Sequence, residues 1–441
     1  MINKISIFFT FLIIILPISL ISGPAIPDLT ITFSSIFFLF LIYYKKNFEL
    51  LLENNLLILS IFFWGYLLLI SIIAENKYLS FRDAIIFIRI LFIPILFFYL
   101  FSIDKKYLEK IIFVIFFTTI FVTIDTFYQY TQYDPELGFG RDLFGFVSNW
   151  YGRLTGPFGD ELIPGAYLSK FTFLGLIFLF IKIQNKNYLN LISIIYLISI
   201  GLTIFATGER MAMATFLMGL VFLFIFFKNK RIIFLLSLIL IIFFSYISIK
   251  IHPFYNDYKI IESTPYHLGL KIEKQFKCKN NKSIVCNKTI VLQPEFSQVI
   301  KNFKISAYGE IYNLGIKMLQ DHKFFGTGLN NFTYLCKNDE RYINIMKNYT
   351  CVSHPHNLYI QWLVETGIIG FLIFLIYLTF IIYLIIKKYK NEYSIIGLAT
   401  LLILFWPIMS TGSLLKNWNG ISSFYIIGIC LALYQLNKKT D

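Results

Sequence analysis

The chain has 441 residues, of which 57% are hydrophobic, 19% are aromatic and only 15% are charged. A soluble globular domain carries roughly 25% charged residues, so this composition excludes a soluble enzyme, a disordered chain and a nucleic-acid-binding module. The formal net charge of +14 comes in short lysine clusters between apolar runs. This pattern is typical of an integral membrane protein whose loops fix its orientation.

Apolar stretches of about 17–22 residues recur along the chain, and each is long enough to cross a bilayer as a helix. The sequence therefore predicts an all-α polytopic membrane protein with about twelve transmembrane helices. The predicted spans are 5–22, 28–44, 55–74, 84–102, 111–130, 164–181, 188–207, 211–227, 232–249, 367–386, 393–411 and 421–436.

Basic clusters such as Lys45-Lys46, Lys105-Lys106 and Lys387-Lys388 fall in every second connection between these spans. The positive-inside rule then predicts that both termini are cytoplasmic. The chain divides into residues 1–249 with helices 1–9, an extracytoplasmic loop domain at 250–366, and residues 367–441 with helices 10–12.

The large loop contains four of the five cysteines, and an even, clustered set outside the cytoplasm is typical of disulfides. Their order along the chain favours Cys278–Cys286 and Cys336–Cys351, although four cysteines allow three connectivities. Free buried thiols are the alternative interpretation.

Seven of the 39 basic residues are arginine, so an arginine in this lysine-rich chain marks a place where the planar guanidinium is needed. Arg89, Arg153 and Arg210 lie near the predicted outer face. Guanidinium groups bind phosphate oxygens in a bidentate manner, which indicates a lipid diphosphate as ligand. For each arginine alone, an interfacial anchor or an ion pair with Asp or Glu is the alternative.

His356 and Asn357 stand where the large loop returns to the membrane, and Gly367 and Gly370 follow at a spacing that permits close helix packing. An imidazole at such a boundary has a pKa suited to accepting a proton from a hydroxyl group. A lone interfacial histidine is more often structural, but the pattern of residues around His356 indicates a catalytic role.

The pattern His356-Asn357, nine residues, Gly367-Ile-Ile-Gly370 resembles the signature of the bacterial O-antigen ligase and polymerase family. Three further segments resemble that family: Thr207-Gly208-Glu209-Arg210, with Glu in place of Ser, Arg153-Leu-Thr-Gly-Pro-Phe-Gly-Asp160, and Glu310-Ile-Tyr312 through Gly326-Thr-Gly328. The family usually has a second arginine before the last of these segments. This chain has none there, and Lys301, Lys304 or Arg341 are the candidates to replace it.

The resemblance implies a metal-independent, inverting glycosyltransferase without a cofactor, which moves a glycan from undecaprenyl diphosphate to a lipid A–core sugar on the periplasmic face. His356 would act as the base or orient the acceptor, and Arg210 would bind the diphosphate with help from Arg153 and Arg89. An O-antigen polymerase joining lipid-linked repeat units is the alternative within this class. A polysaccharide or lipid transporter is the alternative from another class, although carriers usually show two related halves, which this chain lacks.

Overall fold

In the computed structural model, the structure describes residues 2–45, 54–104, 106–133, 139–150, 152–256, 259–262, 270–276, 286–292, 296–347, 349–388, 391–408, 410 and 412–437. The chain forms two compact units. The first unit comprises Met1–Ile115 and Glu310–Asp441, and the second comprises Phe116–Gly309.

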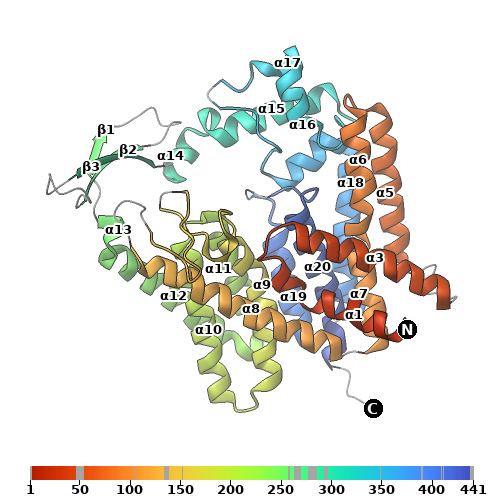
Figure 1. Ribbon diagram of the computed structural model, residues 1–441, viewed down its shortest axis with the longest axis horizontal. Helices are drawn as coiled ribbons and strands as arrows, with labels where there is room; N and C mark the ends of the chain where they lie inside the picture. Colours follow the sequence, from red (N-terminus) through yellow and green to blue (C-terminus); the bar gives the residue numbers. More distant parts are fainter. Residues whose placement is uncertain are drawn as a thin grey trace. The chain divides into compact units, whose positions relative to one another are not determined.

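The first unit is a helical bundle built from both ends of the chain (Figure 1). In it, α5 packs against α6 and α18, while α20 packs against α3, α7 and α19. Its helices are α1 (Ile2–Ile14), α2 (Leu16–Ser19), α3 (Ala25–Lys45), α5 (Asn55–Ile73), α6 (Lys77–Leu91), α7 (Ile93–Ile103), the start of α8 (Lys106–Thr131), most of α15 (Ala307–Asp321), α16 (Asn331–Asn338), α17 (Glu340–Ile343), α18 (Leu358–Tyr383), a π-helical turn (Leu384–Lys388), α19 (Glu392–Leu404), α20 (Asn417–Ala432) and a 3-10 turn (Leu433–Asn437).

In the second unit, α9 lies against both α10 and α11, and these two helices pack in turn on α12. The elements of this unit are the remainder of α8, η1 (Gly156–Phe158), α9 (Pro164–Lys182), α10 (Lys186–Ala206), α11 (Arg210–Phe226), η2 (Lys228–Lys230), α12 (Arg231–Ile251), α13 (Pro253–Asn256), β1 (Lys259–Glu262), β2 (Leu270–Phe276), β3 (Cys286–Leu292), α14 (Phe296–Lys301) and η4 (Phe303–Ile305).

Eight helices in the described residues are long and apolar enough to cross a membrane: α3, α5, α8, α9, α10, α12, α18 and α20. The apolar helices α11 and α19 are shorter. The first and fourth predicted spans are each divided, because Pro17 and Pro94 start new helices at α2 and α7. A multi-pass helical membrane protein is therefore confirmed, while the count of twelve spans stays a prediction.

The large loop adds an element that the all-α prediction did not include. Strands β1, β2 and β3 form an antiparallel sheet in that order. Strands β2 and β3 pair regularly from Leu270 opposite Leu292 to Phe276 opposite Cys286. The pairing of β1 with β2 is irregular between Ile260 and Glu262. The helical class holds for the rest of the described chain.

Helix α18 begins at Leu358, whereas the predicted tenth span begins at residue 367. Residues 358–366, which the sequence predicts to lie in the loop domain, therefore form the first part of α18, directly before the apolar span. His356 and Asn357 are consequently the two residues immediately before a long membrane helix. This position sets the geometry of the candidate site.

Candidate active site

The turn at residues 207–210 joins α10 to α11 in the second unit, and Arg153 lies against it. Gly208 has a φ of 72°, a conformation that favours glycine. The Nε of Arg153 donates to the Thr207 carbonyl oxygen at 3.1 Å. Its Cδ and Nε lie 3.4 Å from the position that a Cβ on Gly208 would take. Arg153 and Arg210 also repel each other electrostatically, so these two predicted diphosphate ligands are neighbours in the structure.

Glu209 fastens the same turn to the start of α9. Its Oε1 accepts the Gly165 N–H at 2.7 Å and its Oε2 accepts the Ala166 N–H at 2.9 Å. Burial raises the pKa of Glu209 to about 7, although the two N–H groups and the charges of Arg153 and Lys170 favour its ionised form. Burial also lowers the pKa of Arg153, but a guanidinium remains charged in proteins.

The segment that carries Arg153 is held from α8. The side-chain oxygen of Gln129 accepts the N–H groups of Thr155 and Gly156 at 3.1 and 2.9 Å. A Cβ on Gly156 would lie 2.2 Å from the Thr126 hydroxyl oxygen, so this position has room only for glycine. The glycine of the Arg-Leu-Thr-Gly segment therefore allows the Arg153 loop to sit directly on α8.

In the first unit, His356 has an uncommon backbone conformation, with a φ of 54°. A non-glycine residue in the left-handed region costs on the order of 1–3 kcal/mol, and such residues are concentrated at functional sites. The rings of His354 and His356 lie 4.3 Å apart between centroids. Burial lowers the pKa of His356 from its ordinary value of 6.5. His356 is therefore neutral at pH 7, the form in which a ring nitrogen can accept a proton.

Asn357 caps α18, since its Oδ1 accepts the N–H groups of Tyr359 and Ile360, both at 3.0 Å. Its Nδ2 donates to the Pro407 carbonyl oxygen at 2.8 Å. Further along α18, the Gln361 amide donates to the Ser413 hydroxyl at 2.7 Å. The first two turns of α18 are thus tied to the connection between α19 and α20.

Helix α18 is broken at Gly367, which has φ 67° and ψ −175°. The segment 323–328 fills the break with backbone hydrogen bonds on both sides of it. These bonds run from Thr327 N to Val364 O at 3.0 Å, from Gly328 N to Glu365 O at 3.0 Å, from Ile368 N to Lys323 O at 2.9 Å and from Ile369 N to Phe324 O at 3.3 Å.

The glycines of both motifs make this interlock possible. A Cβ on Gly367 would lie 2.2 Å from the Phe324 carbonyl oxygen, and one on Gly326 would lie 2.5 Å from the Glu365 carbonyl. Gly370 instead serves close helix packing, because a Cβ there would lie 2.5 Å from the Tyr66 ring on α5. The expectation of helix packing thus describes Gly370, whereas Gly367 serves the break.

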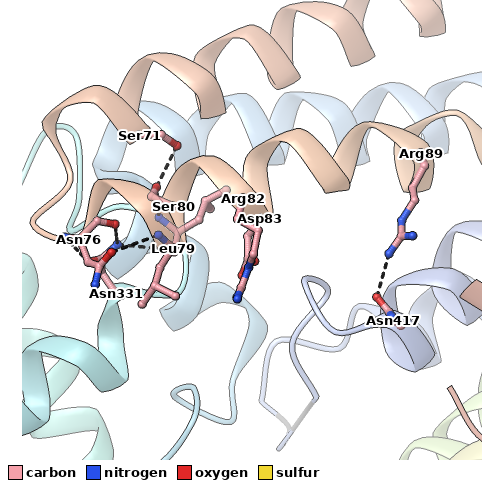
Figure 2. A network of polar contacts seen from close by, with 10 residues as sticks. Ser71, Asn76, Leu79, Ser80, Arg82, Asp83, Arg89, Asn331 and Asn417 are labelled. Atoms are coloured by element: carbon pink, nitrogen blue, oxygen red, sulfur yellow. Dashed lines mark hydrogen bonds and ion pairs between the residues drawn. The ribbon is translucent and has the colours of Figure 1, made fainter. Parts of the chain in front are cut away.

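The tip of the α5–α6 hairpin holds the other side of this loop, as Figure 2 shows. The Asn76 N–H donates to the Asn331 side-chain oxygen at 2.8 Å. The Ser71 and Ser80 hydroxyls lie 2.8 Å apart, and Ser80 also accepts the Leu329 N–H at 3.0 Å. The loop that interlocks with α18 is therefore held by α18 on one side and by the α5–α6 hairpin on the other. The start of α18 is held by this loop and by the connection between α19 and α20.

Arg89 is engaged within the first unit. Its Nη1 donates to the Thr32 hydroxyl at 2.7 Å. Its Nη2 donates to the Asn417 side chain at 3.1 Å (Figure 2). Nη2 also forms an ion pair with Asp28 at 2.5 Å. The contacts join α3, α6 and the first turn of α20. They favour the ion-pair interpretation, and a diphosphate role for Arg89 stays a prediction.

Cys336 and Cys351 form a disulfide with a Cα–Cα distance of 5.9 Å, the pairing that their order along the chain favoured. Cys336 is buried in an apolar cluster with Leu314, Met318 and Val364 of α18. The other favoured pair falls on Cys278, which lies outside the described residues. Cys430 is a buried free thiol.

The replacement for the missing second arginine stays open. The Nε and Nη2 of Arg341 bind both carboxylate oxygens of Asp339, so its planar fork is occupied. Lys301 ends α14 and Lys304 lies in η4, both in the second unit. Nothing in the described contacts distinguishes these two lysines as phosphate ligands.

Sequence reasoning did not select His354 or Glu365 for the site. Glu365 lies two turns into α18 with 1% of its surface exposed. Its Oε2 accepts from Gln361 at 3.3 Å, and its Oε1 has no hydrogen-bond partner among the described residues. The acidic residue in an otherwise apolar helix was the available signal. His356 and Arg210 belong to different units, so their separation stays a prediction.

Comparison with known proteins supports the motif-based resemblance. Residues 194–375 match the family described as O-antigen ligase. The matched stretch holds Arg210, the Cys336–Cys351 disulfide and the whole His356 to Gly370 motif. No curated protein matches the chain. The family match thus agrees with the resemblance of these motifs to the O-antigen ligase and polymerase family.

Proposed function

We propose that the protein is an O-antigen ligase that transfers a glycan from undecaprenyl diphosphate to a sugar hydroxyl of lipid A–core at the periplasmic face of the inner membrane. The observation that carries the proposal is the left-handed conformation of His356 directly before α18, where burial lowers the pKa of its ring. The Asn357 cap and the α18 interlock fix this position.

In the proposed reaction the acceptor oxygen attacks the anomeric carbon, and the bond from that carbon to the diphosphate oxygen breaks. His356 accepts the hydroxyl proton or orients the hydroxyl. Arg210, with Arg153 beside it, stabilises the negative charge that develops on the departing diphosphate. A displacement from the face opposite the leaving group inverts the configuration at the anomeric carbon.

The charge on the leaving group explains why two arginines would be useful at one turn. A diphosphate released from a glycan gains negative charge as the bond breaks, and a fixed guanidinium needs no reorganisation at that moment. Arg153 is fixed by the Thr207 carbonyl, and the turn of Arg210 is fixed by Glu209. These supports keep the proposed ligands in place before substrate arrives.

The test is transfer by purified protein in detergent, with the lipid-linked glycan extracted from the producing membranes and glycan-free lipid A–core as acceptor. His356→Ala and Arg210→Ala should abolish the product, and Arg210→Lys should be severely impaired because one ammonium cannot replace the planar fork. Arg231→Lys, on the predicted cytoplasmic side, is the matched control and should retain full activity.

The same assay separates the alternatives. A transporter would give no covalent product in detergent, where no compartments exist. A polymerase would extend the lipid-linked glycan itself and would not require lipid A–core. Full activity of Arg210→Lys would remove the diphosphate role assigned to Arg210.

A further inference from the structure

We propose that Glu209 is a positioning residue for the diphosphate-binding arginines: its carboxylate docks the turn at 207–210 onto the first turn of α9 and balances the charges around Arg153. The inference rests on the proposed function, because it assigns Glu209 to the reaction through Arg153 and Arg210. Glu209 itself would touch neither the glycan nor the diphosphate.

The docking geometry uses both carboxylate oxygens. The N–H groups of Gly165 and Ala166 belong to the first turn of α9 and have no acceptor within that helix. Each is accepted by one oxygen of Glu209, at 2.7 and 2.9 Å. An anion is also favoured at this end of a helix by the helix dipole. The residue directly before Arg210 is therefore attached to α9 at two points.

Gly165 permits the close approach. A Cβ at this position would lie 2.7 Å from the Thr207 hydroxyl and 2.9 Å from Glu209 Oε1. A larger residue would collide with the Thr207 hydroxyl and with the Glu209 carboxylate that docks the turn. The start of α9 and the 207–210 turn are thus complementary in shape. Their contact fixes the position of Arg210, the first residue of α11.

The surrounding charges show why a carboxylate is present. Glu209 interacts favourably with Arg153 from the loop and with Lys170 from α9, which is 8% exposed. Arg210 on α11 is a third basic group beside Glu209, and, together with burial, its positive charge lowers the pKa of Arg153. A neutral side chain such as serine could accept one N–H but would not provide the negative charge that interacts favourably with Arg153 and Lys170.

This arrangement makes transfer sensitive to protonation of Glu209. The pKa of Glu209 is raised to about 7, and protonation removes the negative charge beside Arg153 and Lys170. We expect the transfer rate of the unmodified protein to fall as the pH decreases through about 7. The pKa of His356 lies below 6.5, so its own loss of activity occurs at lower pH and is separable.

The experiment compares pH profiles of transfer for Glu209→Gln, Glu209→Asp and the unmodified protein, with the extracted lipid-linked glycan as donor. Glu209→Gln keeps the size of the side chain but offers only one acceptor and no charge. We expect its rate at about pH 8 to fall on the order of 10- to 100-fold, as for displaced catalytic groups. Its acid limb should move from about 7 to below 6.5. Glu161→Gln, an exposed glutamate of the same unit, is the control and should leave the profile unchanged.

Glu209→Asp retains the charge, so it should keep an acid limb that Glu209→Gln lacks and should lose less activity than Glu209→Gln. If Glu209→Gln is not recovered as a monodisperse protein, the acid limb of the Glu209→Asp profile serves as the test of the inference. A full rate with an unchanged limb in Glu209→Gln, or no such limb in Glu209→Asp, overturns the inference. Activity in His356→Ala and Arg210→Ala would instead overturn the proposed function, so the two failures are distinguishable.

Discussion

Replacing Gly367 by alanine should weaken the structure at the start of the apolar span. Gly367 has φ 67° and ψ −175°, a conformation used almost only by glycine, and an alanine there costs about 1–3 kcal/mol. The added Cβ would also lie 2.2 Å from the Phe324 carbonyl oxygen and 2.6 Å from the Gly326 nitrogen. Both neighbours are backbone atoms, so they cannot rotate away as a flexible side chain would.

Relief of this contact requires the segment 323–328 to move. At least two of the four backbone bonds that fill the α18 break would then be lost, and each contributes about 1 kcal/mol net. Together with the backbone term, Gly367→Ala should destabilise the protein by about 3–5 kcal/mol. The effect should reach His356, because the same interlock fixes the start of α18.

The assay is the apparent melting temperature of the detergent-solubilised protein, followed by tryptophan fluorescence, together with glycan transfer. Gly65→Ala on α5 is the matched control, since nothing lies within 4 Å of a Cβ there. Alanine in a helix interior is favoured over glycine by about 0.5–1 kcal/mol, so this control should be neutral or stabilising. Equal melting temperatures for Gly367→Ala and Gly65→Ala would refute the role given to the break.

Three further outcomes are expected. Arg89→Ala should lower the apparent stability by about 1–3 kcal/mol, and adding Asp28→Ala should recover part of the loss, since the unpaired carboxylate is removed; no recovery would contradict the ion-pair role. Cys336→Ser should lower the free energy of unfolding by about 3 kcal/mol, because it frees a 15-residue loop. Thermal stability and protease sensitivity measure this loss, and the fully reduced unmodified protein is the comparison. His354→Gln should reduce transfer about tenfold or more without changing the melting temperature, because its ring packs on that of His356; unchanged transfer would leave His354 a structural residue.

Hydropathy predicted much of the helical architecture because long apolar segments have few other options in a membrane. It placed the turn that carries Arg210 between two helices, where the structure has it. It did not show that α18 begins nine residues earlier than the apolar run. Gln361, Glu365 and Thr366 are polar, so the sequence predicts their segment to lie in the loop, but all three side chains are buried.

Contacts between distant parts of the chain explain the remaining differences. The sequence leaves both a ligand role and an ion pair open for Arg89, because its partner Asp28 lies on another helix and no local pattern connects the two. Gly367 was interpreted as a packing residue because a glycine in an apolar helix gives no sign of a break. The break exists only because the segment 323–328 supplies hydrogen bonds to it. Such long-range backbone pairing has no signature in either segment alone.

His356 and Arg210 should lie close together if they serve one reaction. They lie in different compact units, which the chain joins near residues 115 and 309. A base and a phosphate ligand that serve one displacement must flank the same sugar carbon, so their functional atoms should lie within roughly 15 Å. His356→Cys combined with Arg210→Cys, with Cys430 replaced by alanine, should therefore be linked by a bis-maleimide of about that span.

Mass spectrometry of the linked peptides identifies which two positions have reacted, and each single variant should give no such peptide. His356→Cys combined with Arg231→Cys is the control, because Arg231 is predicted on the cytoplasmic side and lies at the opposite end of the α11–α12 hairpin from the 207–210 turn. Linkage of 356 to 231 but not to 210 would place the proposed base and the proposed diphosphate ligand at separate sites. One displacement reaction could not then use both residues, and Arg210 would need another role.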